Sequence, residues 1–424
     1  MGYERKSCHF VSKDWEHHNG RQNDQDWHHA TGTSTQSGQN QHSNKKHHHE
    51  QYHNIANYSN SDSTRQTSDS QRTGENTSVV DDDEGHLVYQ NGDMLTGRYE
   101  IIGTLGEGAF GKVVECIDHS NNDCVRVAMK IVKNIDTYRD VAMSEVAILS
   151  KMNTVDSDNQ FACVRMLDWF NHQGHICIVF ELLGLSTYDL LQKNNFKPFP
   201  LESIRHMAYQ IIKAVRFLHR NKLTHTDLKP ENILFVDSDY AALYFSKKGK
   251  GELPLDFPEV RVVDFGNATY DHEYHAAIVS TRHYRAPEVI LDLGWNQACD
   301  VWSLGCILME FYLGLTVFQT HSNREHLAMM ERVLGPIPTQ LLQKTRKKCY
   351  VNRNRLDWDA RSSSGRYVRK HCKPLREYMT SRGQEHYQLF NLIQRMLEYD
   401  VAQRITLNEA LAHPFFKSLR KSKK

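Results

Sequence analysis

The sequence HTDLKPEN, residues 225–232, decides how the rest of the chain is interpreted. Residues 214–219 before it predict a helix and residues 232–236 after it predict a strand, because both runs are mainly apolar. Its polar side chains therefore lie on a turn between two apolar elements, where a rigid scaffold can present them. Asp227 can take a proton from a hydroxyl group, and Asn232 can reach a metal ion. These residue types are common, so the stretch indicates a function only if other motifs accompany it in the chain.

Four further motifs surround this stretch in chain order. GEGAFGKV occupies residues 106–113, VAMK occupies 127–130, DFG occupies 264–266 and APE occupies 286–288. A glycine loop lets backbone N–H groups approach phosphates, because a side chain would block them. In a dinucleotide-binding fold the third glycine would open a helix, whereas here the strand pattern continues after it. Together the motifs resemble the protein kinase signature set.

Three stretches narrow this resemblance within the protein kinases. EHLAMMER at 325–332 resembles the LAMMER signature of the CLK kinases, and HTD at 225–227 and STRHYRAPE at 280–288 are similar to that family. The resemblance covers roughly residues 81–418. It implies an α+β, bilobal kinase fold, with a strand-rich N-lobe at about 98–182 and a helical C-lobe at about 183–418.

Lys130 is the first residue with a predicted chemical role. It stands in a strand predicted at 125–132, beside apolar residues, where a charged group is costly unless it is paired. Its amine either extends into water or, as the resemblance implies, pairs with ATP phosphates and with an acid on the following helix. The resemblance makes Glu145 the expected acid, because Ser144-Glu145-Val146 matches the family's position, and Asp136 and Asp140 are poorer candidates near the predicted helix start.

The resemblance assigns the remaining chemistry to four residues. Asp227 is expected to orient the substrate hydroxyl as a base, and Lys229 to neutralise charge on the transferring phosphoryl group. Asn232 and Asp264 are expected to bind Mg²⁺, which favours a few carboxylate or carbonyl oxygens together with phosphates and water. The alternative for each residue is an ordinary exposed loop position. Three further residues, Glu288, Arg404 and Asp300, are expected to be structural.

The resemblance also implies an ATP site at the glycine loop and at the link between the lobes. The Glu181 carbonyl and the Leu183 amide are expected at the adenine edge, Asp189 at the ribose, and Phe180 behind the pocket, where it can equally be plain core. The complete set is Leu105, Gly106, Glu107, Gly108, Ala109, Phe110, Gly111, Lys112, Val113, Ala128, Lys130, Glu145, Phe180, Glu181, Leu183 and Asp189.

Composition divides the chain into a polar tail and a kinase domain. Residues 1–85 are rich in His, Asn, Gln and Ser and are expected to be disordered, with 86–424 as the domain. The tail's His clusters suit either weak metal binding or a solvated linker, and the acidic run at 81–84 is interpreted as solvated. The nine Cys include no C-x-x-C pair, which fits reduced thiols in the cytosol or nucleus.

Charge and hydropathy exclude some partners. The formal net charge is +1, which is too mild to indicate direct nucleic-acid binding. No apolar run reaches the length of a membrane span, and no apolar signal core follows Met1. Two stretches are interpreted as insertions, 237–258 and the basic, turn-rich 345–374, which are either plain surface loops or elements that dock substrate.

Thr226 stands where most protein kinases have Arg, and the CLK family shares this Thr. Arg282 and Arg285 are therefore the candidates for tethering the activation segment between Asp264 and Glu288, through carboxylates or backbone carbonyls. The alternative is that one of them replaces the missing Arg and binds a phosphate on that segment. The tail contains no Arg-Ser or Ser-Arg dipeptide, which family members commonly have there.

The sequence predicts a monomeric, ATP- and Mg²⁺-dependent protein kinase acting on Ser and Thr, and on Tyr by autophosphorylation. The resemblance implies Arg/Ser-rich splicing factors as substrates and the nucleus as location. The alternatives are a pseudokinase scaffold, which loss of Lys130, Asp227 or Asp264 would favour, and a kinase for another class of protein.

Overall fold

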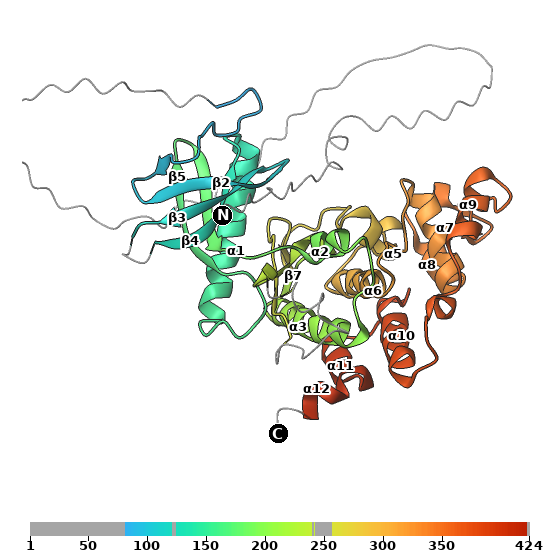
Figure 1. The fold of residues 1–424 in the computed structure, drawn as a ribbon. Coiled ribbons are helices and arrows are strands. Elements are labelled where there is room, and N and C mark those ends of the chain that lie inside the picture. The colour runs from blue at the N-terminus through green and yellow to red at the C-terminus, as the bar shows by residue number, and fades with distance from the viewer. Residues whose placement is uncertain (1–80, 121–123, 240, 242–256, 422–424) are drawn as a thin grey trace, which may run out of the picture. The chain divides into compact units, whose positions relative to one another are not determined.

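The computed structural model describes residues 81–120, 124–239, 241 and 257–421. The His clusters and nearly all of the predicted polar tail lie outside the described residues, as does most of the insertion predicted at 237–258. The described chain forms a sheet with one long helix, followed by a mainly helical region (Figure 1). These are the two lobes that the sequence predicts.

A six-stranded antiparallel sheet forms the N-lobe, with strand order β1-β2-β3-β4-β6-β5. Side chains alternate between its two faces, as the pleat of a strand requires, so Val127 and Met129 of β4 are buried on one face. The third predicted strand coincides with β4. The strands are β1 (Met94–Leu95), β2 (Tyr99–Gly108), β3 (Gly111–Asp118), β4 (Val125–Val132), β5 (Met166–His172) and β6 (His175–Glu181).

Helix α1 (Asp136–Val155) packs against the sheet through its apolar stripe. Ala142, Val146 and Leu149 are buried in one hydrophobic cluster with Ile178 of β6. These positions recur at helical spacing, so they share one face of α1. Glu145 lies within the same stripe and is only 2% exposed, which brings a carboxylate to the sheet.

Asp81 and Gly85 tie the start of the described chain to the N-lobe. The ring of His175, fully buried, lies between two oxygens, with Nδ1 2.7 Å from Val132 O and Nε2 2.9 Å from Asp81 Oδ1. The backbone N–H of Asn134 donates to Gly85 O at 2.9 Å. Sequence reasoning put both residues in the tail and interpreted the acidic run as solvated. That interpretation is wrong for Asp81, because its carboxylate contacts the buried ring of His175. The local sequence does not show this contact, because the two residues lie 94 positions apart.

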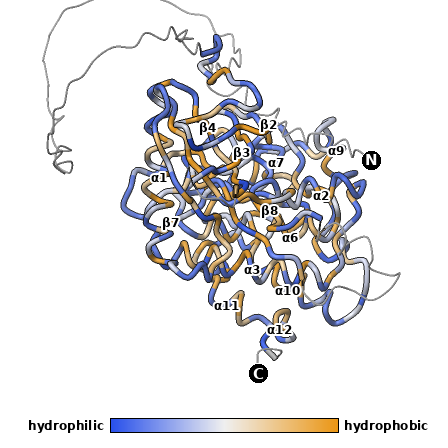
Figure 2. Tube along the Cα trace, turned by 60° about the vertical axis from the view of Figure 1, so that its left-hand side comes forward, coloured by the Kyte–Doolittle hydropathy of each residue, from blue (hydrophilic) through white to orange (hydrophobic). Residues whose placement is uncertain are grey.

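The C-lobe is built around α6, which is buried along almost its whole length. Figure 2 shows hydrophobic segments gathered around α3, β8 and α6, with hydrophilic loops outside them. No helix in the described ranges has the length and hydropathy needed to cross a bilayer. The helices are α2 (Thr187–Lys193), α3 (Leu201–Arg220), α5 (Pro287–Ile290), α6 (Ala298–Leu313), α7 (Asn323–Leu334), α8 (Thr339–Lys344), α9 (Ser363–His371), α10 (Gln384–Met396), α11 (Leu407–Ala412) and α12 (Lys417–Lys421).

Short strand pairs and 3₁₀ turns connect these helices and position the site. The pairs are β7 (Leu223–Thr224) with β10 (Thr269–Tyr270), β8 (Ile233–Phe235) with β9 (Val260–Val262), and β11 (Val351–Asn352) with β12 (Arg355–Leu356). The 3₁₀ turns are η1 (Pro230–Asn232), η2 (Arg282–Tyr284), η3 (Lys348–Tyr350), η4 (Leu375–Tyr378) and η5 (Pro414–Phe416).

Candidate active site

Asp300 fixes the backbone of the loop that contains Asp227. It enters from the first turn of α6 and is fully buried. Its Oδ2 accepts the N–H of His225 at 2.9 Å, and its Oδ1 accepts the N–H of Thr226 at 2.9 Å. Thr226 has a φ of 69°, an unfavourable left-handed conformation that these bonds hold in place. The structural role predicted for Asp300 is confirmed.

Asp227 lies at the centre of a small hydrogen-bond network. Its Oδ1 accepts the backbone N–H of Thr281 at 2.8 Å and the Thr281 hydroxyl at 2.6 Å. Its Oδ2 lies 3.1 Å from Lys229 Nζ. Burial by itself would raise the pKa of the Asp227 carboxyl, but Lys229 and Thr281 outweigh burial, so the pKa lies below its ordinary value. The carboxylate is therefore ionised at neutral pH.

Asn232 and Asp264, the two predicted metal ligands, lie on adjacent segments, because the N–H of Val263 donates to Asn232 O at 3.0 Å. The Asn232 side-chain amide donates from Nδ2 to Asp227 O at 2.9 Å, which leaves its oxygen available for a cation. Asp264 has a φ of 67° and a side chain that is 38% exposed. Its Oδ1 lies 3.7 Å from Lys130 Nζ, so the carboxylate faces the N-lobe amine.

Lys130 and Glu145 form the ion pair that the sequence predicts. Lys130 Nζ donates to Glu145 Oε2 at 2.7 Å, across the interface between β4 and α1. Burial disfavours the charged amine, but Glu145 and Asp264 outweigh burial and raise the pKa of Lys130. Asp136, the poorer candidate, is 94% exposed and pairs with Arg139 instead.

The glycine loop is the turn of the β2–β3 hairpin. Gly108 pairs with Gly111, so Ala109 and Phe110 form the tip. A Cβ at Gly111 would lie 2.1 Å from Ile131 O, so only glycine fits there. The Phe110 ring packs edge-on against Tyr138 of α1, with 5.2 Å between centroids. The loop therefore folds back toward the helix that carries Glu145.

The predicted link between the lobes follows β6. Phe180 pairs with Ala128 across the sheet and packs against the main hydrophobic cluster, so it has the predicted core role. The Leu183 N–H has no hydrogen-bond partner within the described residues. Asp189 caps α2, where its Oδ2 accepts the hydroxyl of Ser186 at 2.7 Å.

Phe110, Lys130, Tyr138, Glu145 and Asp264 line a small cavity between the sheet, α1 and the DFG turn. The structure thus brings together residues from the glycine loop, VAMK and DFG motifs. A larger cavity, of about 360 Å³, lies among η4, α10 and η5, and no predicted site residue lines it. The small cavity is the candidate active site, because the charged side chains of Lys130, Glu145 and Asp264 line it.

The activation segment is held by hydrogen bonds to backbone carbonyl oxygens. Thr226 Oγ1 donates to Asn267 O at 2.9 Å. Arg285 donates from Nε to Val279 O at 2.9 Å and from Nη2 to Ser280 O at 2.7 Å. Tethering of Arg285 by backbone carbonyls, one of the two predicted modes, is confirmed. Arg282 binds a side-chain amide instead.

Thr281 is a site residue that sequence reasoning missed. It donates two hydrogen bonds to Asp227, and Lys229 Nζ lies 3.4 Å from its hydroxyl. The available signal is its position in STRHYRAPE, a stretch in which the sequence predicts roles for Arg282, Arg285 and Glu288 but none for Thr281. Nothing in the local pattern of either segment predicts contact across the intervening chain.

Comparisons with known proteins agree with this geometry. Residues 99–416 match the family model described as "Protein kinase domain". The chain is 62% identical over 354 residues to dual specificity protein kinase CLK4 of Mus musculus, covering 84% of this chain and 73% of that protein. It is 64% identical to dual specificity protein kinase CLK1 of Homo sapiens, covering 81% and 71%. A crystal structure of a kinase domain superposes with a TM-score of 0.70 at 34% identity, covering 79% of this chain and 100% of that one.

Proposed function

The chain belongs to the protein kinase family and, within it, to the CLK dual specificity kinases, and from that membership we propose which residues transfer the phosphoryl group and to which proteins. The chain is an ATP-dependent protein kinase. The observation that carries the residue assignment is the network in which Thr281 and Lys229 hold the ionised Asp227.

Asp227 orients the hydroxyl of the acceptor Ser or Thr and takes its proton as the new bond to phosphorus forms. Thr281 and Lys229 fix one carboxylate conformation, so the acceptor oxygen meets a positioned base. Lys229 also offsets the negative charge that develops on the transferring group. The leaving group is ADP, which departs with the pair of electrons from the broken P–O bond.

Lys130 binds the donor's phosphates, and Glu145 holds the amine in place from α1. The glycine loop contributes backbone N–H groups. The Leu183 amide, which has no hydrogen-bond partner among the described residues, suits the adenine edge. The oxygens of Asn232 and Asp264 fit a hard divalent cation, and we assign Mg²⁺ to them. A bound Mg²⁺ supplies charge neutralisation at the phosphates.

We also propose Arg/Ser-rich splicing factors as substrates, the nucleus as location and a monomer as the working form. The warrant is membership of the CLK group, because composition alone does not specify them. A pseudokinase scaffold is disfavoured, because Lys130, Asp227 and Asp264 are all present, with Lys130 beside Asp264 and Lys229 beside Asp227.

Phosphorylation of an arrayed peptide library by the purified chain tests this proposal. Peptides with Arg-Ser dipeptides should be phosphorylated preferentially, and kcat/KM should drop when Arg-Ser is changed to Glu-Ser. Equal kcat/KM for the two peptide sets would refute the substrate class but not the kinase assignment. Absence of transfer to any peptide in the library, together with no ATP-dependent autophosphorylation, would contradict the catalytic assignment.

A further inference from the structure

Residues 345–374 carry a concentrated positive charge on the C-lobe. The segment has ten Lys and Arg residues against two Asp and no Glu. In the structure it runs from the end of α8 through η3, the β11–β12 pair and α9. All ten basic residues are exposed: Arg346, Lys347, Lys348, Arg353, Arg355, Arg361, Arg366, Arg369, Lys370 and Lys373. We call these ten side chains the basic surface.

Little within the described residues neutralises this charge. Among ion pairs of the described chain, only Arg346 of the ten takes part, with Nη1 3.6 Å from Asp292 Oδ1. Within the described residues, neither of the segment's two acids forms an ion pair with any of the ten basic side chains. Asp357 pairs with Arg324 of α7 at 3.9 Å, and Asp359 Oδ1 accepts the backbone N–H of Arg361 at 2.8 Å. The basic surface therefore presents most of its charge to a partner.

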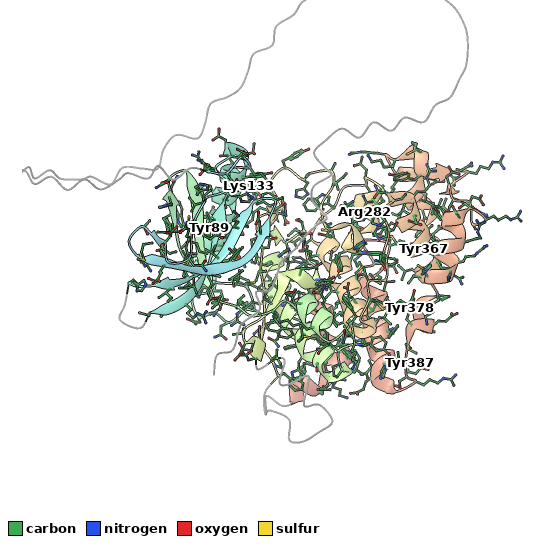
Figure 3. The ribbon with its side chains drawn as sticks, turned by 45° about the horizontal axis from the view of Figure 1, so that its top comes forward. Tyr89, Lys133, Arg282, Tyr367, Tyr378 and Tyr387 are labelled. Carbon is green, nitrogen blue, oxygen red and sulfur yellow. The ribbon has the colours of Figure 1, made fainter. Side chains whose placement is uncertain are left out.

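The segment is a fixed scaffold and not a free loop. Val368 and Cys372 are buried in the hydrophobic core, and α9 packs against α7. Arg366, Arg369 and Lys370 have the spacing of one helical face, opposite Val368. Figure 3 shows long side chains that end in nitrogen and extend outward from the ribbon around Tyr367. A rigid row of cations lowers the entropy cost of binding an extended anion.

Two hydrogen bonds connect this segment to the activation segment. Arg282 Nη1 donates to Asn323 Oδ1 at 2.8 Å, and Asn323 Nδ2 donates to the Tyr350 hydroxyl at 3.3 Å. Arg282 directly follows Thr281, which contacts the base Asp227. The basic surface therefore begins close to the part of the C-lobe where a protein substrate receives its phosphate.

We propose that the basic surface binds phosphorylated Ser or Thr segments of a substrate that the active site has already modified. Each phosphate carries about −1.5 to −2 charges at neutral pH, and Arg guanidinium groups bind phosphate oxygens in pairs of hydrogen bonds. An unphosphorylated Arg-rich segment is repelled by the same surface. A first phosphorylation thus creates the ligand that retains the substrate for the next one. The proposal rests on the kinase activity, not on the Arg/Ser substrate class.

Single-stranded RNA is the other polyanion that such a surface attracts. RNA binding commonly adds aromatic rings on which bases stack. Tyr367, an exposed aromatic side chain of α9, already packs against the ring of His371, with 4.0 Å between the ring centroids. This arrangement favours a phosphopeptide, which needs cations and no stacking platform.

Fluorescence anisotropy with the full chain tests the proposal. The probes are a synthetic Gly/phosphoserine peptide, its unphosphorylated counterpart and an RNA oligonucleotide of matched charge. The test variant is Arg366→Gln/Arg369→Gln/Lys370→Gln. The control variant is Lys197→Gln/Arg220→Gln/Lys417→Gln, which removes three exposed cations from elsewhere in the C-lobe. Circular dichroism confirms that both variants fold.

The phosphopeptide should bind the unaltered chain more tightly than its unphosphorylated counterpart. The α9 variant should weaken that binding by about tenfold, given the size of exposed charge–phosphate contacts, whereas the control variant should leave it nearly unchanged. In steady-state assays the α9 variant should raise KM for a primed peptide with kcat unchanged, and should leave an unprimed peptide unaffected.

Three results would overturn the proposal: equal affinity for the two peptides, equal losses in the α9 and control variants, or RNA binding that is tighter than phosphopeptide binding and is lost in the α9 variant. Because the phosphopeptide is synthetic and contains no Arg, these results do not depend on which proteins the enzyme phosphorylates.

Discussion

Two ion pairs of the same chemical type have different surroundings in the two lobes. Lys130 and Glu145 meet at 2.7 Å beside the small cavity, and the Lys130 side chain is 19% exposed. Arg404 and Glu288 meet in the C-lobe core, with Nη1–Oε1 2.6 Å, Nη2–Oε2 2.8 Å and an Arg404 side chain that is 0% exposed. One pair is open to a third partner and the other is closed.

The unused donors explain the difference. Arg404 also donates from Nε to Glu398 O at 2.9 Å and from Nη1 to Ala298 O at 2.8 Å, so its guanidinium is enclosed by acceptors. Lys130 has one bond to Glu145 and a looser contact with Asp264, which leaves capacity for phosphate oxygens. A reachable pair supports chemistry, whereas an enclosed pair supports the fold.

Asp264→Asn, which alters the surroundings of the open Lys130–Glu145 pair, should have the largest effect on activity. Loss of the metal-binding charge should reduce transfer by about 10⁴-fold, or roughly 5 kcal/mol in the barrier. The free energy of unfolding should hardly change, because the Asp264 side chain is 38% exposed. Initial rates and urea unfolding measure the two quantities, with Asp140→Asn at an exposed position of α1 as the control. Transfer like that of the unaltered chain would contradict the role of Asp264.

Arg404→Met should break the closed ion pair between Arg404 and Glu288. It leaves Glu288 buried without a partner, which costs roughly 3–5 kcal/mol for a buried pair. Urea unfolding should show this loss, whereas Arg395→Met at an exposed position of α10 should change stability little. If Arg404→Met were as stable as the unaltered chain while losing transfer, this pair would belong to the catalytic machinery.

How far the sequence predicts these pairs depends on where the signal lies. Lys130 and Glu145 are predictable, because Lys130 stands in an apolar strand and the sequence around Glu145 matches the position of the paired acid in the family that the chain resembles. The sequence also predicts Arg285 as a tether of the activation segment, with backbone carbonyls as one of two possible acceptors. The contacts Thr281–Asp227 and Asp81–His175 were not, because each joins segments that no local periodicity relates.

Glu310, a buried carboxyl group of α6, extends the comparison to the pH dependence of stability. Burial raises the pKa of Glu310 to about 7, and a hydrogen bond from Tyr284 at 2.7 Å only partly opposes the rise. The folded state thus holds a proton between the unfolded pKa and about pH 7, so stability falls as pH rises through that window. The loss amounts to ~3 kcal/mol.

Glu310→Gln keeps an acceptor for Tyr284 and removes the ionisation. Unfolding free energies measured from pH 5 to pH 8 should therefore fall less steeply for this variant than for the unaltered chain. Glu377→Gln, at an exposed position of η4, serves as the control. Its unfolding free energy should fall with pH as steeply as that of the unaltered chain. Parallel slopes for the unaltered chain and Glu310→Gln would show that this carboxyl does not titrate in the window.

Phosphatase treatment should have the smallest effect. Thr226 and Arg285 hold the activation segment through carbonyl oxygens, and the Thr281 hydroxyl is already bonded to Asp227. Dephosphorylated enzyme, verified by intact mass, should keep its initial rate within about threefold, or ~0.7 kcal/mol. A hundredfold loss that returns together with phosphate on Ser280 or Thr281 would refute this view of the segment.

The central claim is that Lys130 belongs to the chemistry and not to the fold, and Lys130→Met tests it most directly. Single-turnover transfer and urea unfolding should be measured on the same preparation of the full chain. We expect loss of nearly all transfer, with a smaller loss of unfolding free energy than in Arg404→Met, because the Lys130 side chain is 19% exposed beside the cavity whereas that of Arg404 is 0% exposed. Retained transfer, or a loss of stability like that of Arg404→Met, would contradict it.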